Sequence, residues 1–232
     1  MRIFIFILHI LLLFPPMAHA FELFPMVTFF SPQGSKSEQF FQVNNTTEQP
    51  LPLEVFVRQR HIANDNLEQL TETEDFFVFP PQVLIPPKST QMVKVKYIGN
   101  LVDTSQSYRV VFSQLPIKDD VKESSIKMLF QIGALVFVSP TNVSNTMSAD
   151  ITYQDNHPAS MELANTGDGV IIIPQLSFNV KSDHANHNWK WQDIQHLLNQ
   201  QYLVPGESVN IAIDTLLSPK DSQAKVDIKE NR

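Results

Sequence analysis

Few side chains in this sequence are spaced for catalysis or metal binding. His184 and His187 lie three residues apart with Asp183 upstream, but no third ligand has a spacing that directs it at them. Serine, histidine and aspartate occur without the G-x-S-x-G turn of a hydrolase, and the adjacent acids Asp119 and Asp120 lie in a hydrophilic stretch. We therefore predict no catalytic residue and no metal, and we expect a solvated loop at the two histidines.

The composition excludes several further classes of chemistry. The 232-residue chain has no cysteine, which removes thiol nucleophiles, Cys-ligated zinc and iron–sulfur clusters. It has six glycines and neither of the glycine-rich phosphate-binding motifs. Its formal net charge of −7 argues against a protein held on nucleic acid by broad electrostatics. The sequence thus indicates a protein that is not an enzyme, has no cofactor and binds no nucleic acid.

The most informative pattern for binding is a row of large apolar side chains at alternate positions. In a strand over 125–138, these side chains would lie on one face, roughly 6.8 Å apart. They are Ile126, Met128, Phe130 and Ile132. Such alternation most often marks the inner face of a sandwich strand. A strand of ~14 residues is nevertheless long. It also follows the polar segment 118–125, so its front half, up to Gly133, could form an edge that is open to a partner.

The first twenty residues have the pattern of a secretory signal peptide. Arg2 supplies a positive charge, an apolar run follows, and Ala18-His19-Ala20 is a small-x-small cleavage site. We expect cleavage after Ala20 and export of the mature chain. No later segment approaches ~18 consecutive apolar residues, so we expect no membrane insertion of the mature chain.

The sequence predicts that short β-strands position these residues throughout the mature chain. Runs rich in Val, Ile, Phe and Thr are separated by Pro, Asn, Asp and Ser clusters, a spacing typical of β-sandwiches. The expected strands are 26–30, 39–43, 53–58, 76–79, 83–85, 91–97, 107–114, 125–138, 148–153, 159–163, 170–178, 202–204 and 209–214. A break at 139–142 divides the chain into two lengths that each suit one immunoglobulin-like domain of ~100 residues. We expect an N-terminal domain over 21–139 and a C-terminal domain over 140–232.

Three segments complete this reading of the elements. The paired prolines Pro80-Pro81 and Pro86-Pro87 cannot lie in a central strand, so they mark turns or edges. The segment 189–201 has some helical spacing but is equally compatible with a loop that contains one turn. The charged tail after Leu217 is expected to be frayed.

Several short motifs, taken in order, resemble one known family. They are Phe29 with Gly34-Ser35, Gln42-Val43-Asn44-Asn45, Pro80-Pro81, Ile85-Pro86-Pro87, Met92-Val93-Lys94-Val95, Tyr108-Arg109-Val110-Val111-Phe112, Leu115-Pro116, Asn165-Thr166-Gly167 and Val204-Pro205-Gly206. In order and spacing the chain resembles the PapD-like periplasmic chaperones of the chaperone–usher pathway, which assemble pili (fimbriae). The sequence around Tyr108 is more similar to that of the archaic class of these chaperones than to that of the best-known, classical class.

The resemblance implies two immunoglobulin-like domains set at an angle, with a cleft between them. It also implies that the chain binds, folds and caps pilin subunits by donor-strand complementation, then delivers them to an outer-membrane usher. The alternating strand would be the lent one, and its side chains would fill pockets in a subunit that lacks its last strand. A fully buried Ile, Met or Phe contributes about 1.5–3 kcal/mol of transfer free energy.

The sequence departs from the family at the residues that hold the subunit's C-terminal carboxylate. The best-known, classical members of the family have an Arg on the first strand and a Lys on the last, and the corresponding positions here carry Met26 and Leu135. We therefore hypothesise that another cation holds the carboxylate, with Lys94, Lys96 and Arg109 as candidates. For Lys94 and Lys96, an ordinary solvated strand face is the competing interpretation.

Two other functions remain open at this stage. A secreted pilin-like or adhesin β-sandwich would need a donor extension at its mature N-terminus, and 21–30 is apolar without clean alternation. A secreted hydrolase on a β scaffold would need a convergent catalytic set, which the sequence lacks.

Overall fold

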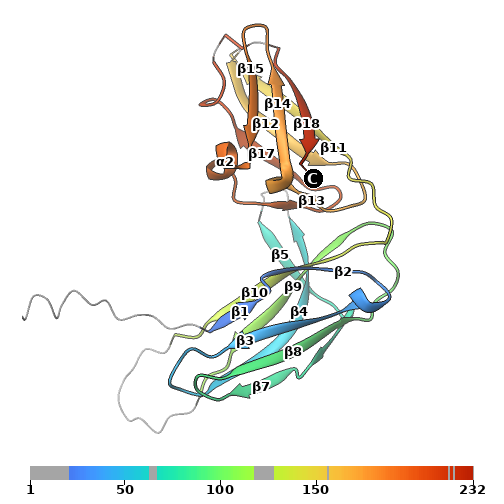
Figure 1. The fold of residues 1–232 in the computed structure, drawn as a ribbon, viewed down its shortest axis with the longest axis vertical. Helices are drawn as coiled ribbons and strands as arrows, with labels where there is room; N and C mark the ends of the chain where they lie inside the picture. Colours follow the sequence, from blue (N-terminus) through green and yellow to red (C-terminus); the bar gives the residue numbers. More distant parts are fainter. Residues whose placement is uncertain are drawn as a thin grey trace, which may run out of the picture.

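The computed structural model describes residues 21–62, 67–117, 128–155, 157–218, 220–221 and 223–231. The expected signal peptide, 1–20, lies outside these residues. The expected all-β fold is confirmed, in two lobes set at an angle (Figure 1). One hydrophobic core runs from Phe21 to Val138 and a second from Met161 to Leu217, so a core lies on each side of the break at 139–142. Within the described part of the chain, no helix is long and apolar enough to cross a membrane.

The first domain is a sandwich of two sheets. One sheet has the order β1 (Glu22–Phe24), β3 (Glu38–Asn44), β8 (Thr90–Tyr97) and β6 (Phe76–Phe79). The other has the order β2 (Val27–Phe30), β10 (Gln131–Val138), β9 (Gln106–Gln114), β4 (Leu51–Ile62) and β5 (Glu68–Glu72), with β7 (Gln82–Ile85) also on β4. Side chains alternate along β8, where Val93 and Val95 are buried and Met92 is exposed. The prolines also lie as expected, since β6 ends at Phe79 and β7 ends at Ile85.

The sheets of the second domain have fewer strands than those of the first. They are β11 (Met147–Gln154), β12 (His157–Asn165) and β17 (Ser208–Ala212); β15 (Asn186–Lys190), β14 (Leu176–Lys181) and β18 (Lys225–Glu230); and β13 (Ile171–Ile172) with β16 (Tyr202–Leu203). The segment 189–201 contains one helical turn, α2 (Trp191–Ile194), followed by the 3-10 turn Gln195–Leu197. A further 3-10 turn, Ser35–Ser37, lies in the first domain.

Two expectations for the second domain are wrong. The single strand over 170–178 is divided into β13 and β14 by the 3-10 turn Ile173–Gln175, because Pro174 has no N–H to continue a ladder. The tail after Leu217 is not frayed throughout, because its last part forms β18, which pairs with β14 over six residues. Its charged side chains lie on an edge strand, where they face water.

A buried asparagine closes a turn in each domain, at the end of β3 and of β12. The Asn45 amide donates to the carbonyls of Gln49, Ile85 and Pro86, at 2.8 to 3.1 Å. In the second domain, the Asn165 amide donates at 2.8 Å to the carbonyls of Gly169 and Leu203. These contacts give a physical role to two of the short motifs found in the sequence.

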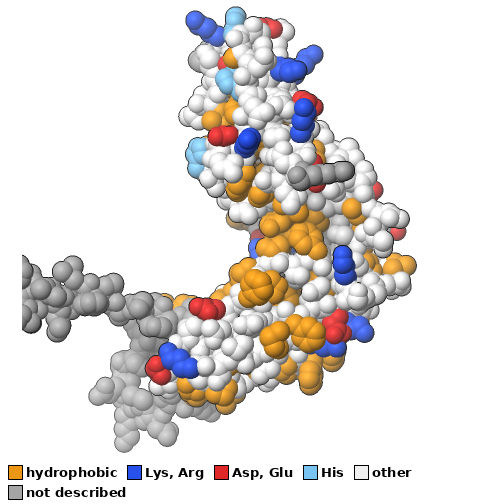
Figure 2. All heavy atoms as spheres, viewed as in Figure 1, with side chains coloured by type: hydrophobic (Ala, Val, Ile, Leu, Met, Phe, Trp, Pro, Cys, Tyr) orange, Lys and Arg blue, Asp and Glu red, His pale blue; other side chains and the backbone are white. Residues whose placement is uncertain are grey.

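The two domains are joined by packed apolar side chains. Leu135 and Phe137 of β10 and Val170 of the second domain are buried together, and Tyr202 packs against them. The rings of Phe137 and Tyr202 have centroids 5.2 Å apart. In Figure 2, hydrophobic side chains gather at this junction, between the two lobes. The contact therefore holds the second domain against the sheet that contains β10.

Candidate functional site

The strand β10 has one edge that is only partly paired. Along its whole length it pairs antiparallel with β9, but on its other side it pairs parallel with β2 only from Leu135 to Val138. The last contact on that side is a 2.8 Å bond from the Leu135 N–H to the Met26 carbonyl. The chain then crosses at Pro25 to the other sheet, where β1 pairs with β3. Among the described residues, no strand pairs with this side of Gln131–Ala134, so an open edge remains.

The alternating row continues the domain's own core toward that open edge. Ala134, Val136 and Val138 are fully buried in the first core. Ile132 and Phe130 are partly buried against the same core, and Met128 is 69% exposed. Ile126, the first member of the row, lies outside the described residues. From Val138 back to Met128, the side chains of the row thus change from buried to solvent-exposed. The apolar face of the core therefore extends beyond the part that the domain itself covers.

The strand itself is shorter than the sequence predicted. We expected a strand over 125–138, but β10 begins at Gln131, and residues 128–130 are not in a strand. The neighbouring strand β9 ends at Gln114, and Pro116 follows it without an N–H to donate. The Gln114 N–H donates a 2.9 Å hydrogen bond to the Phe130 carbonyl, one residue before β10 begins. Within the described part of the chain, the β9–β10 ladder therefore ends where β9 ends.

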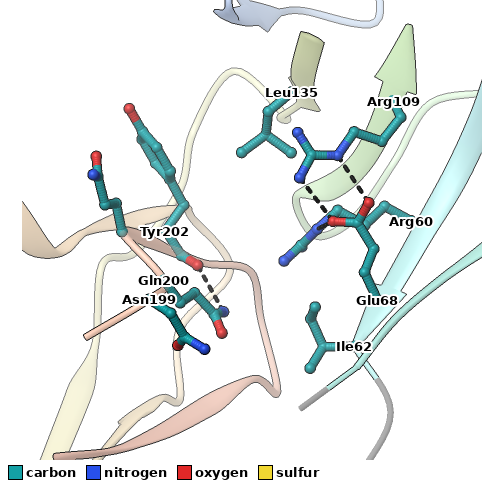
Figure 3. A pocket seen from close by; sticks show the side chains of 9 residues that line it. Arg60, Ile62, Glu68, Arg109, Leu135, Asn199, Gln200 and Tyr202 are labelled. Atoms are coloured by element: carbon teal, nitrogen blue, oxygen red, sulfur yellow. Dashed lines mark hydrogen bonds and ion pairs between the residues drawn. The ribbon is translucent and has the colours of Figure 1, made fainter. Parts of the chain in front are cut away.

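A cleft of about 290 Å³ lies between the domains, next to β10 (Figure 3). The first domain contributes two arginines, one glutamate and two aliphatic side chains, and the second contributes residues 199–202, just before and within β16. The lining residues are Arg60, Ile62, Glu68, Arg109, Leu135, Asn199, Gln200, Gln201 and Tyr202. Charged groups therefore face an amide-rich segment across the junction.

Arg109 and Glu68 form a two-point ion pair in this cleft. The Arg109 Nε–H donates to Glu68 Oε1 at 2.9 Å, and Nη2–H donates to Oε2 at 2.8 Å. The guanidinium also donates from Nη1 to the Gly133 carbonyl at 3.3 Å. The side chain of Arg109 lies across Gly133, where an added Cβ would come within 3.4 Å of its Cδ atom. An added Cβ there would make only ordinary van der Waals contact with the arginine.

A second arginine links the two domains. Arg60 is buried and donates from Nη1 at 3.1 Å to both Ser107 Oγ and Glu207 Oε1 of the second domain. Its Nε–H donates to Glu68 Oε2 at 2.9 Å, so Glu68 bridges Arg60 and Arg109. The side chains of Arg60 and Glu207 are 6% and 9% exposed, so this pair is shielded from solvent.

The two carboxyl groups respond to these surroundings in opposite directions. Burial tends to raise the pKa of Glu68, but Arg109 and Arg60 together outweigh it and hold that pKa below its usual value. Burial raises the pKa of Glu207 above its usual value, although Arg60 lowers it in part. The surroundings of Glu68 therefore favour its ionised form, whereas Arg60 only partly offsets the effect of burial on Glu207.

The residues that were candidates for holding a carboxylate are not brought together. Arg109 lies in the cleft, directly opposite Leu135 in the β9–β10 register. Lys94 and Lys96 lie on β8 in the other sheet, do not line the cleft, and Lys94 pairs with Glu38 at 2.7 Å. The arrangement of Lys94 and Lys96 is that of a solvated strand face.

Reasoning from the sequence missed Arg60, Glu68 and Glu207. The expected strand ended at Arg58, before Arg60, and β5 has five exposed residues with no apolar alternation. Arg60 and Glu207 are 147 residues apart in the chain, so no local pattern signals their pairing. The solvated loop expected at the two histidines is correct for His184 but wrong for His187, which lies in β15. Among the described residues, no group of three or more His, Asp or Glu is placed to hold a metal.

Comparison with solved structures shows the fold. The class 5 fimbriae chaperone CfaA superposes with a TM-score of 0.62 at 14% identity, covering 92% of each chain. The CsuC–CsuE chaperone–tip adhesion subunit complex of the archaic Csu pili of Acinetobacter baumannii gives 0.53 at 14% identity, covering 85% of this chain and 92% of that one. The Salmonella enterica SafA pilin–SafB chaperone complex gives 0.57 at 10% identity, covering 86% of each chain.

The sequence comparisons identify the family. A search of curated proteins gave no match. The family model described as "Pili and flagellar-assembly chaperone, PapD N-terminal domain" matches residues 26–144, which is more than half of the chain. This match includes β2, β9, β10 and both arginines of the cleft. The chain therefore belongs to the PapD-like family of pilus-assembly chaperones.

Proposed function

We propose that this protein is a periplasmic chaperone that binds pilin subunits by lending them the open edge of β10, and that it passes them to an outer-membrane usher. The observation that carries the proposal is the coincidence of an unpaired strand edge with an incomplete core row. A strand that lacks a neighbour at Gln131–Ala134 offers main-chain groups to an incoming strand. The row from Ile132 to Met128 offers apolar surface on the face of the domain's own core.

The energetics favour an apolar, strand-lacking partner. Met128 exposes most of its side chain, and its full burial would contribute about 1.5–3 kcal/mol. Phe130 and Ile132 already rest partly on the first core, so a partner would cover only the rest of their surface. The same partner could satisfy the free N–H and C=O groups of the edge, which gives a reason for ordering a strand there.

The structural neighbours support a pilin as the partner. The titles of two of them describe complexes with a tip adhesion subunit and with a pilin. We propose the same class of partner here. We also propose that a signal peptide is removed after Ala20, and that the domains span 21–139 and 140–232.

Arg109 is the residue that we propose for the subunit's C-terminal carboxylate. It lies in the cleft beside Leu135, and Leu135 is bonded to Met26 through the backbone. These are the two positions at which the resemblance implied a basic pair. The guanidinium of Arg109, on the neighbouring strand β9, places a cation beside Leu135. Its planar arrangement of N–H donors suits the two oxygens of a carboxylate.

Paired substitutions next to the edge test the proposal. Met128→Glu puts a charge on the row, whereas Leu129→Glu puts the same charge at the adjacent, 49%-exposed position. In cells that co-express a cognate pilin, we expect Met128→Glu to abolish periplasmic pilin accumulation and Leu129→Glu to retain it. Both variants should fold, because both side chains are exposed in the free protein. Normal periplasmic pilin levels with Met128→Glu would refute the proposal.

A further inference from the structure

The cleft already contains the kind of group that Arg109 is proposed to bind. The carboxylate of Glu68 takes two parallel hydrogen bonds from the Nε and Nη2 sides of the Arg109 guanidinium. That pair of N–H groups is one of the fork positions at which arginine holds a carboxylate in two-point geometry. In the free protein this position is therefore occupied from within the chain.

The charges in the cleft are also balanced. Two guanidinium groups, Arg60 and Arg109, face two carboxyl groups, Glu68 and Glu207. With both acids ionised, the four side chains carry no net charge. A further carboxylate that joined Arg109 while Glu68 stayed in place would meet a like charge at short range, which is unfavourable.

We propose that Glu68 is a resident competitor, which occupies Arg109 in the free protein and must give up that contact when a polypeptide's C-terminal carboxylate enters the cleft. This inference rests on the proposed function, since it names what controls the binding of the subunit's end. Glu68 then determines specificity: a neutral group cannot replace it on the guanidinium, whereas a carboxylate can.

The position of Glu68 makes the exchange physically simple. It is the first residue of β5, an edge strand that pairs only with β4 among the described strands and has no buried residue. Its Oε2 atom also accepts from the Arg60 Nε–H at 2.9 Å. When Glu68 releases Arg109, it keeps Arg60, so its charge does not become unpaired. The exchange needs a rotation of one side chain and no change of fold.

The test uses the whole protein and small probes. N-acetyl-diglycine as the free acid presents a chain-terminal carboxylate, its amide presents none, and N-acetyl-glutamate α-amide presents a side-chain carboxylate. Binding is followed by the NMR signal of the Arg109 Nε–H during titration. Glu68→Gln removes the competing charge. Glu72→Gln is the matched control, because Glu72 lies on the same strand and pairs outside the cleft with Arg58, at 2.8 Å.

We expect the free acid to bind Glu68→Gln about 2- to 5-fold more tightly than the wild type, the gain corresponding to the loss of one solvent-accessible ion pair. Glu72→Gln should bind as the wild type does, and the amide should show no gain. Glu68→Ala, which removes the hydrogen-bonding group as well, should gain at least as much. The side-chain carboxylate should gain in the same way, because Glu68 competes with any carboxylate for Arg109. An equal gain for the uncharged amide would refute the competition.

Unchanged or weaker binding by both Glu68 variants would overturn the inference, because it would mean that Glu68 only holds Arg109 in place. This outcome is distinct from a failure of the proposed function. If the wild type recovers pilin from the periplasm and the Glu68 variants gain nothing, the inference alone fails. If the wild type recovers no pilin, the proposed function fails, and the probe titrations still decide whether Glu68 competes for Arg109.

Discussion

Arg60 is the group whose removal most directly tests how the two domains are held together. Its guanidinium is 6% exposed and contacts Glu207 of the second domain, which is 9% exposed. Arg60→Met keeps the aliphatic volume but leaves Glu207 buried without its cation. Loss of one partner of a buried ion pair costs about 3–5 kcal/mol. Arg58→Met is the control, since Arg58 lies on the same strand and its partner Glu72 is exposed. That exposed pair contributes only about 0–1 kcal/mol.

The cost of Arg60→Met should depend on pH. Burial raises the pKa of Glu207, and without Arg60 nothing in that ion pair opposes the effect. For a carboxyl group with a raised folded-state pKa, stability is greatest below its unfolded-state pKa of about 4.3 and is lost as the pH rises through the folded-state value. The difference in free energy of unfolding between wild type and Arg60→Met should therefore be larger at pH 8 than at pH 5.

Urea unfolding followed by two signals gives the measurement. The chain's two tryptophans, Trp189 and Trp191, both lie in the second domain, so fluorescence reports that domain and far-UV circular dichroism reports both. We expect the two transitions to separate in Arg60→Met. The double variant Arg60→Met/Glu207→Met should recover at least about 1 kcal/mol relative to Arg60→Met alone, because no charge is left buried. Additive single effects, or equal midpoints for Arg60→Met and Arg58→Met, would refute a buried interdomain ion pair.

Two further predictions concern the domains themselves. Asn165→Ala leaves two buried carbonyls without their donor and should lower the free energy of unfolding by about 2–4 kcal/mol in urea titrations; a loss below about 1 kcal/mol would contradict this role. Burial and the neighbouring Asp75 raise the pKa of both Tyr97 and Tyr108. Absorbance at 295 nm should therefore show fewer than all four tyrosines ionising near pH 10 in the native protein, and all four in urea; equal native and denatured titrations would exclude this effect.

The sequence predicted the fold where burial follows a simple period. On β8 and β9, apolar side chains alternate or run together because one sheet face or both are covered, and these strands were found nearly to the residue. The strands that were missed, β1, β5, β15 and β18, all lie at sheet edges, and the last three are largely polar. Pairing with a neighbour, which local sequence does not record, places them in the sheets.

The candidate site was predictable in part for the same reason. The apolar row was visible because it extends a core pattern, but its strand was drawn too long, since the end of the neighbouring strand at Gln114 limits β10. Arg109 was found through the departure from the family at Met26 and Leu135. The ion pairs of Arg60 and Glu68 depend on contacts between β4, β5 and the second domain. Contacts between distant segments produce no local residue spacing from which they could be predicted.

Strand donation is tested most directly by position-by-position cross-linking along residues 128–132. A photoreactive side chain is placed at each position in turn, and the complex with a cognate pilin is irradiated. We predict cross-links to the subunit from Met128, Phe130 and Ile132 that are several-fold stronger than those from Leu129 and Gln131, because alternate residues of a strand face opposite sides. Equal yields at all five positions, or none at any of them in a complex that co-purifies, would contradict donation of this strand.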